Sequence, residues 1–210
     1  MRFFYDCEFI EDGRTIDLVS IGVVAEDGRE FYAISTDFDP ARANEWVRHN
    51  VLDQLPGPAS PSWRSRAAIR DGLLQFLTGP GPTGTVRTGP GPTGPVRTGS
   101  GPTGTVLTGP SPTGNRPRVE LWAWMAAYDH VCLAQIWGDM RALPRPIPRF
   151  THDLRQRWED AGAPSLPPVP ADQHDALADA RHNLARWQAI EAARVEPGAQ
   201  THDRTAQSHP

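Results

Sequence analysis

The chain has 210 residues, a formal net charge of −4 and two cysteines without a CxxC pair, which predicts one domain with a sizeable core and disfavours a disulfide framework or a zinc site. The acidic balance leaves no strongly basic surface for nucleic acid, although bound metal ions would supply positive charge for a phosphate substrate. Because an acid stands at position 6 and no apolar run approaches the roughly 18 residues of a membrane span, we expect neither a signal peptide nor a membrane anchor, and hence a cytoplasmic protein.

The N-terminal part predicts three β-strands. Residues 2–10 alternate in polarity and carry aromatic side chains, and residues 15–25 form a strongly apolar, β-branched run. Asp27 and Gly28 are a hairpin turn signal, after which residues 30–36 are predicted as the third strand. Together these segments predict an antiparallel meander.

Two segments with helical character, 41–50 and 62–77, precede a repeat of ten residues. Between positions 78 and 117 the sequence TGPGPTGTVR occurs four times with substitutions, and this stretch holds 11 of the 19 glycines and 9 of the 22 prolines. Proline removes a backbone donor and glycine costs backbone entropy, so such a stretch cannot build a core. We therefore interpret 78–117 as a disordered insertion.

The second half of the chain predicts one strand and three helices. Residues 118–125, RVELWAWM, are predicted as a buried strand, and a helix is expected from about 129 to 138. Another helix is expected over about 151–161 with Thr151 as a candidate N-cap, and a last one over about 175–194.

Without the repeat, the two flanking parts make a coherent domain. We expect residues 1–77 and 118–194 to form one domain, and the polar segment 195–210 to be a flexible tail.

The first candidate site residues are Asp6 and Glu8, two positions apart in a predicted strand. Successive side chains of a strand point to opposite faces, so both carboxylates project to one side and Cys7 to the other. Most carboxylate pairs on strands are simply solvated. Here the strand is otherwise aromatic and apolar, and it precedes the most apolar strand of the chain, which favours a site.

Asp129 directly follows the predicted buried strand. The join between the end of a strand and the start of a helix is where α/β folds place site residues. Alternatively, Asp129 caps the helix. Its neighbours Tyr128 and His130 are interpreted as local packing and surface groups.

The segment from His174 to Asp179 has the pattern H-x4-D at the start of an amphipathic helix. Five residues of helix rotate by about 500°, so the two side chains share a site only if His174 lies in the preceding loop. Four prolines between positions 164 and 170 favour such a loop. Asp175 is the expected helix cap.

Converging carboxylates repel one another unless cations neutralise them. Two divalent metal ions would do so, and would also support the cleavage of a phosphodiester.

In the type and order of its motifs, the chain resembles the DEDDh branch of the 3'-5' exonuclease superfamily, over about residues 2–77 and 118–192. Three motifs carry the resemblance: D-x-E at positions 6 and 8, an Asp at 129 after a central strand, and H-x4-D from 174 to 179.

The resemblance implies an α/β, RNase H-like fold, in which helices flank a mixed central sheet led by the meander. It also implies two Mg²⁺ ions, or Mn²⁺, held by Asp6, Glu8, Asp129 and Asp179. Asp6 would bridge the ions, Glu8 and Asp179 would hold the ion that binds the attacking water, and Asp129 would support the second ion. His174 would be the general base.

The implied substrate is a single-stranded RNA 3' end, from which 5'-nucleoside monophosphates are removed. Glu8, Phe9 and Ile10 are the implied contacts of the terminal nucleotide, although Phe9 in the core is an alternative. The stretches WAWMAAYDH and HDALADAR are closer still to polyadenylate-specific exoribonucleases of that branch, which implies a preference for adenylate-rich tails. A homodimer is implied as well.

Three alternatives remain open. An oligoribonuclease or a DNA-trimming 3'-5' exonuclease would keep the chemistry and change the substrate. A nucleic-acid-binding module on an inactive nuclease fold would need no intact set of five residues. A scaffold whose repeat is the working part would lose its function without residues 78–117.

Overall fold

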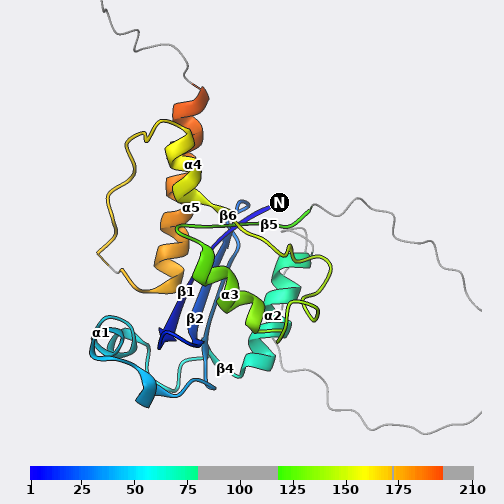
Figure 1. The fold of residues 1–210 in the computed structure, drawn as a ribbon, viewed down its shortest axis with the longest axis vertical. Coiled ribbons are helices and arrows are strands. Elements are labelled where there is room, and N and C mark those ends of the chain that lie inside the picture. The colour runs from blue at the N-terminus through cyan, green and yellow to red at the C-terminus, as the bar shows by residue number, and fades with distance from the viewer. Residues whose placement is uncertain (80–117, 172, 196–210) are drawn as a thin grey trace, which may run out of the picture.

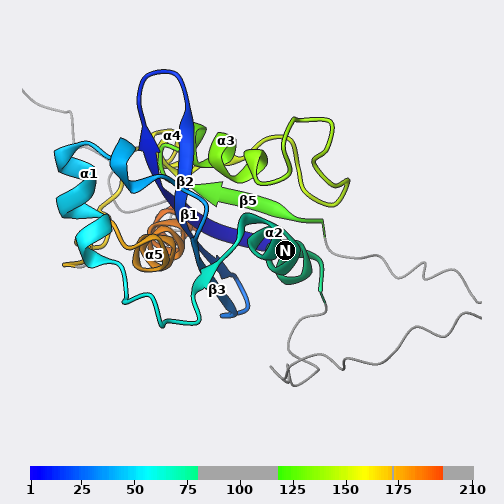
Figure 2. The same cartoon turned by 90° about the horizontal axis from the view of Figure 1, so that it is seen from below.

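The structure is a computed structural model that describes residues 1–79, 118–171 and 173–195. The predicted insertion from residue 80 onward and the predicted tail from residue 196 onward lie outside the described residues. In the described part, six strands form a sheet in the order β4-β3-β2-β1-β5-β6, with helices on both of its faces (Figure 1, Figure 2).

The predicted antiparallel meander is confirmed. Strands β1 (Arg2–Glu11), β2 (Ile16–Ala25) and β3 (Glu30–Ser35) pair antiparallel in sequence order. Gly28 makes the turn between β2 and β3 with φ of 86°, a left-handed conformation that glycine adopts without steric cost. Its N–H donates a 2.9 Å hydrogen bond to the carbonyl of Ala25.

Three short parallel strands complete a mixed sheet. Strand β5 (Glu120–Ala123) pairs with β1, β6 (His152–Asp153) pairs with β5, and β4 (Trp63–Arg64) pairs with β3. Strand β5 is shorter than the predicted 118–125 because the chain turns at Met125, whose φ is 55°. The architecture is mixed α/β, as predicted.

The first predicted helix is divided in two. Residues Pro40–Arg42 form a 3-10 turn, and α1 (Glu45–Asn50) begins after Asn44, whose side chain accepts a hydrogen bond from the N–H of Val47. A second 3-10 turn follows at Leu52–Gln54.

Helix α2 (Arg66–Thr78) begins four residues later than the predicted 62–77, because Trp63 and Arg64 pair with β3 instead. The Ser65 hydroxyl caps it by accepting from the N–H of Ala68. Thr78, assigned from sequence to the repeat, is the last residue of this helix.

Helix α3 (Ala127–Gln135) packs against β1 and β2, and α4 (Leu154–Asp160) follows β6 directly. The predicted N-cap at Thr151 is wrong, because its hydroxyl donates to the carbonyl of Leu121 at 3.1 Å. Asp153 caps α4 instead, through bonds from two backbone N–H groups of the first turn. The last helix, α5 (Ala176–Val195), agrees with the predicted 175–194.

The core lies mainly between the sheet and helices α2 and α3. Phe3, Tyr5 and Cys7 of β1 face these helices and are almost fully buried. Helix α5 packs on the opposite face of β1 and β2, where Phe4 contacts Trp187 with ring centroids 5.5 Å apart. Figure 2 shows α5 and α3 on opposite sides of these strands.

Gly22 of β2 is required where α5 begins. A Cβ at this position would lie 2.2 Å from the carbonyl oxygen of Ala176, closer than any real contact. Only a glycine therefore allows the helix to start this close to the sheet. Within the described residues, no helix combines the length and the apolar character needed to cross a membrane.

Candidate active site

A cavity of about 490 Å³ opens where β1, α1, α3 and the start of α5 meet. All five residues predicted from the H-x4-D, D-x-E and Asp motifs line it. They are Asp6, Glu8, Asp129, His174 and Asp179. They come from three distant parts of the chain, so the fold brings together what the sequence separates.

Asp6 and Glu8 lie on the face of β1 that carries α5, and Cys7 points into the opposite core, as the alternation predicts. They stand opposite Gly22 and Ser20 of β2. Phe3, Phe4 and Tyr5 of β1 are fully buried and point to both faces, and β1 pairs with a strand on each side, so the two carboxylates lie on a central strand. Glu8 is only 9% exposed.

Asp129 is the third residue of α3 and is buried. The residue before α3 is Ala126, which provides no side-chain cap, so the alternative role of Asp129 as N-cap is not observed. Its Oδ1 instead accepts a 2.9 Å hydrogen bond from the backbone N–H of Cys7. This bond attaches α3 to β1 at the residue between Asp6 and Glu8.

His174 lies in the loop before α5, as required for it to share a site with Asp179. Its backbone is left-handed, with φ of 67°, an uncommon conformation for a residue with a side chain. The His174 N–H donates to Oδ2 of Asp179 at 2.8 Å. Asp175 caps α5, as predicted, by accepting from the N–H groups of Leu177 and Ala178.

The site concentrates donor atoms that suit a cation. One donor atom each from Glu8, His174 and Asp179 lie within 4.8 Å of one another. Carboxylate oxygens are the ligands that Mg²⁺ and Mn²⁺ prefer. Among the described residues, this is the one such group of three acidic, histidine or cysteine side chains.

The carboxylates of the cavity resist ionisation in the absence of a cation. Burial, followed by repulsion from Asp179 and Asp129, raises the pKa of Glu8 to about 8. Burial also raises the pKa of Asp129 to about 7, against the lowering effect of the Cys7 N–H. The pKa of Asp6 is raised by burial and by three neighbouring carboxylates. A bound divalent ion would remove this cost, so the residues fit a metal centre.

Several cavity residues were not predicted from the sequence. Trp46 of α1 contacts His174 edge-on, with ring centroids 4.8 Å apart. Tyr128, predicted to be a local packing group, is 53% exposed and stacks on Phe9 with ring centroids 5.9 Å apart. Arg186 of α5 also lines the cavity. No local pattern marks Trp46 or Arg186, because their roles arise only from tertiary contacts.

A β-bulge lies opposite the expected substrate contacts: between Glu8 and Phe9 the pairing skips Val19 of β2, so the alternation of side chains along β1 continues. Phe9 lines the cavity. Ile10 is 1% exposed and belongs to a small core cluster with Val19 and two residues around α1. The Ile10 side chain is thus packed in the core on the face of β1 that also carries Asp6 and Glu8, and its expected contact with the terminal nucleotide stays a prediction.

Comparison with known proteins decides the family. Residues 1–191 match the family model described as the 3'-5' exoribonuclease Rv2179c-like domain. The chain belongs to this family. It is 52% identical over 190 residues to the 3'-5' exoribonuclease Rv2179c of Mycobacterium tuberculosis (strain ATCC 25618 / H37Rv) and to the 3'-5' exoribonuclease MT2234.1 of strain CDC 1551 / Oshkosh. Each alignment covers 90% of this chain and 93% of the relative. The protein is accordingly a 3'-5' exoribonuclease, which is a hydrolase.

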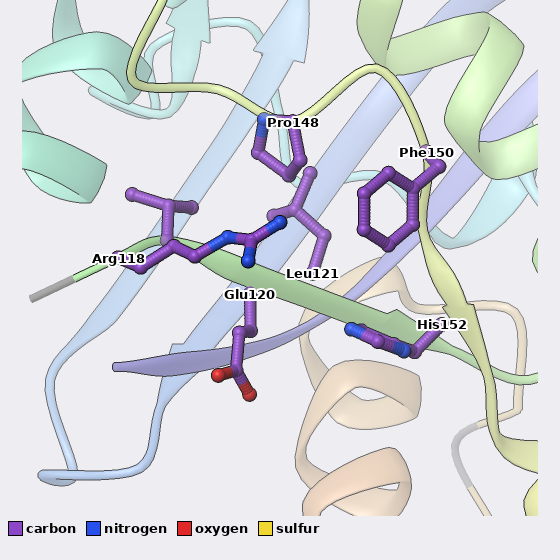
Figure 3. A pocket seen from close by; sticks show the side chains of 7 residues that line it. Arg118, Glu120, Leu121, Pro148, Phe150 and His152 are labelled. Atoms are coloured by element: carbon purple, nitrogen blue, oxygen red, sulfur yellow. The ribbon is translucent and has the colours of Figure 1, made fainter.

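A second cavity of the exoribonuclease, about 210 Å³ in volume, lies at the start of β5 (Figure 3). Its lining includes Arg118, Glu120 and Phe150, and His152, which stacks on Trp122 with ring centroids 4.3 Å apart. This cavity contains one carboxylate, that of Glu120, whose Oε2 lies 3.5 Å from Nε of Arg2. The concentration of acidic groups that could hold cations therefore lies in the larger cavity.

Proposed function

We propose that this exoribonuclease is a metal-dependent enzyme of the DEDDh type, with an RNase H-like fold, that removes 5'-nucleoside monophosphates from RNA 3' ends. One observation carries the proposal: the carboxylates of Asp6, Glu8, Asp129 and Asp179 and the imidazole of His174 line a single cavity. The mixed sheet, led by an antiparallel meander and covered by helices on both faces, supports the fold assignment.

The four carboxylates hold two Mg²⁺ ions, for which Mn²⁺ can substitute. When bound, the ions neutralise the carboxylates and supply an activated water for attack on the phosphodiester. Two of the four side chains are fixed by backbone N–H groups, Asp129 by Cys7 and Asp179 by His174. A carboxylate has two oxygens, so each of these hydrogen bonds still leaves an oxygen for a cation.

His174 is the general base that takes the proton of the attacking water. A neutral imidazole has one ring nitrogen that accepts a proton, which this role requires. Its placement beside Glu8 and Asp179 supports this role. Trp46 limits the rotation of the imidazole through its edge-on contact.

The substrate is single-stranded RNA, with adenylate-rich tails preferred. The resemblance to the polyadenylate-specific exoribonuclease RNase AS carries this preference. The stack of Phe9 on Tyr128 offers an aromatic surface for the terminal base, but stacking accepts every base and does not select adenine. An oligoribonuclease or a DNA-trimming exonuclease is the alternative with the same chemistry. The homodimer implied by the resemblance stays a prediction, which light scattering in solution tests.

The test compares four single strands of equal length, namely oligo(A), oligo(U), oligo(C) and the DNA counterpart of oligo(A), with Mg²⁺ and with a chelator. We expect cleavage only with metal and fastest on oligo(A). Equal rates on all four strands would contradict the adenylate preference. Cleavage that persists in the chelator would contradict the metal dependence.

Two variants test the site in the same assay. His174→Ala is expected to lower kcat by about 10²- to 10⁴-fold, because it removes the general base. Asp6→Ala is expected to abolish measurable activity, because it removes a central metal ligand. Unchanged cleavage in both variants would show that the active site lies elsewhere, and the cavity would lose its assignment.

A further inference from the structure

Arg186 is a cation in a cavity otherwise dominated by carboxylates, and two-metal chemistry alone assigns it no role. It lies on α5 seven positions after Asp179, which is about two helical turns and places both side chains on one face. It is half-buried and lines the large cavity. The charges of Asp179 and Asp6 act on it and favour its ionised form against the pKa-lowering effect of burial.

The guanidinium is fixed by neutral groups. Its Nη1 donates a 2.9 Å hydrogen bond to Oδ1 of Asn183, and the amide of Asn183 donates to the carbonyl of Tyr5 at 3.0 Å. The guanidinium carbon lies 4.4 Å from the ring centre of Trp124, which also lines the cavity. Arg186 is thereby attached to β1 one residue before Asp6 and to the end of β5.

These contacts orient Arg186 without neutralising it. Among the described residues, no ion pair includes its guanidinium, whereas Arg181 on the same helix pairs with both oxygens of Glu30 at 2.8 and 2.7 Å. A guanidinium has five N–H donors, and the bond to Asn183 uses one of them. A fixed, half-buried guanidinium with free donors is suited to an anion, and phosphate matches its planar geometry.

We propose that Arg186 binds a non-bridging oxygen of the scissile phosphate. The inference rests on the proposed active site. Arg186 lines the same cavity as Asp6 and Asp179, two of the proposed metal ligands, and shares a face of α5 with Asp179, so a phosphate held at that centre lies within reach of this guanidinium. After cleavage, the same phosphate is the 5'-phosphate of the released nucleotide, and Arg186 retains its contact with the product.

A purely structural cation would behave differently. If Arg186 only reduced the repulsion between carboxylates, its removal would strengthen Mg²⁺ binding and leave nucleotide affinity otherwise unchanged. A phosphate ligand also predicts tighter Mg²⁺ binding on removal, since a competing positive charge is lost, but it predicts weaker nucleotide binding. Mg²⁺ and nucleotide affinities that change in opposite directions therefore identify the phosphate contact.

The experiment measures the affinities of AMP and of Mg²⁺ by isothermal titration calorimetry. AMP is titrated at saturating Mg²⁺ into the wild-type protein, Arg186→Gln, Arg186→Lys and the matched control Arg181→Gln. We expect Arg186→Gln to weaken AMP binding about 10- to 100-fold, the range of one charge-assisted hydrogen bond. Arg186→Lys keeps the charge but not the planar fork, so a smaller loss is expected. Arg181→Gln is expected to bind AMP as the wild type does.

Unchanged AMP affinity in Arg186→Gln would overturn the inference. Weaker binding of the dinucleotide pApA with unchanged AMP affinity would also overturn it, because the contact would then belong to the next phosphate. If Arg186→Gln does not fold, as judged by circular dichroism, wild-type AMP affinity in Arg186→Lys would overturn it. A wild-type protein that binds AMP no better than Asp6→Ala would instead reject the proposed site itself.

Discussion

Glu8 and Asp129 show that the ionisation of the site depends on whether cations are bound. Each is a carboxylate with less than a tenth of its surface exposed, and each faces other carboxylates. The pKa values of both carboxyl groups are raised in the folded protein. Between the unfolded and the folded pKa values, the metal-free folded protein therefore still holds protons that the unfolded chain has released. The sign of the resulting pH effect follows from this difference.

The metal-free protein is expected to lose stability as pH rises from about 5 to about 8. The unfolded carboxyl of Glu8 loses its proton near 4.5 and the folded one near 8, so the stabilising difference is present below this window and is lost across it. One unit of pKa difference corresponds to about 1.4 kcal/mol, so the melting temperature in a chelator should fall by about 4 °C or more.

Scanning calorimetry at several pH values measures this fall. Glu8→Gln is the matched control and should make the fall shallower, because the glutamine has no proton to lose while Asp6 and Asp129 still do. Mg²⁺ should raise the melting temperature more at the high end of the window than at the low end. A metal-free melting temperature that is constant or rises across the window would show that these carboxylates are not buried as described.

At the scale of elements, the start of α5 and the loop before it position two of the five site residues. Its first turn carries Asp179, its capping loop carries His174, and both depend on how closely the helix approaches β2 at Gly22. Helix α1 lies beside this start (Figure 1, Figure 2) and brings Trp46 against His174. A displacement of α5 by an ångström would therefore move the proposed base and a proposed metal ligand together.

Gly22→Ala is expected to destabilise the protein by about 1–3 kcal/mol, the usual cost of forcing extra atoms into a packed interior. The added Cβ meets the backbone of Ala176, which cannot rotate away as a side chain can. We also expect a loss of activity larger than the loss of folded protein, since the site geometry shifts. Chemical denaturation and kcat measured on the folded fraction test both effects.

Gly57→Ala is the control for this substitution, because a Cβ at Gly57 meets no atom within 4 Å and its φ is not in the left-handed region. It should leave both stability and kcat nearly unchanged. Wild-type stability in Gly22→Ala would mean that α5 can withdraw from β2 without cost.

Residue patterns predicted helices, strands and the faces of their side chains better than they predicted tertiary contacts. The alternation in β1 correctly placed Asp6 and Glu8 on one face, and the H-x4-D spacing correctly required His174 to be in a loop. The helix cap at Thr151 failed because Thr151 and Asp153 are both good caps, and only the pairing of β6 with β5 decides between them. Such pairing is invisible in a local pattern.

The cavity residues missed by sequence analysis have the same explanation. Trp46 and Arg186 lie far from the motifs in the chain and resemble ordinary surface residues of amphipathic helices. Their position depends on the packing of α1 and α5 around the site. Ile10 shows the converse, since its side chain packs into a core cluster with residues around α1, which the local pattern of β1 does not reveal.

At the scale of the whole molecule, the two residues between which the repeat is inserted are separated along the chain from the residues that line the cavity. The repeat begins where α2 ends and rejoins at Arg118, just before β5, whereas the cavity meets the chain at the other end of β5, at Trp124 and beyond. The six positions from Arg118 to Trp124 span about 20 Å when extended.

Replacement of residues 80–117 by a short Gly/Ser linker is expected to leave kcat/KM within about twofold of the wild-type value. Long surface insertions add little to the entropy of loop closure, so the melting temperature should change by only a few degrees. Activity on oligo(A) and calorimetry test this. A loss of activity in a variant that still folds would favour the alternative in which the repeat is the working part.

Because α5 packs against β2, the same helix contributes to the stability of the fold and to the candidate active site. Helix α5 covers one face of the central strands and carries Asp179, and the loop before it carries His174. A polypeptide that ends before this helix would leave Phe4 and its neighbours exposed to solvent, and would lack Asp179 and the hydrogen bond that positions His174. Such an incomplete chain would therefore be less stable and would also lack a complete site.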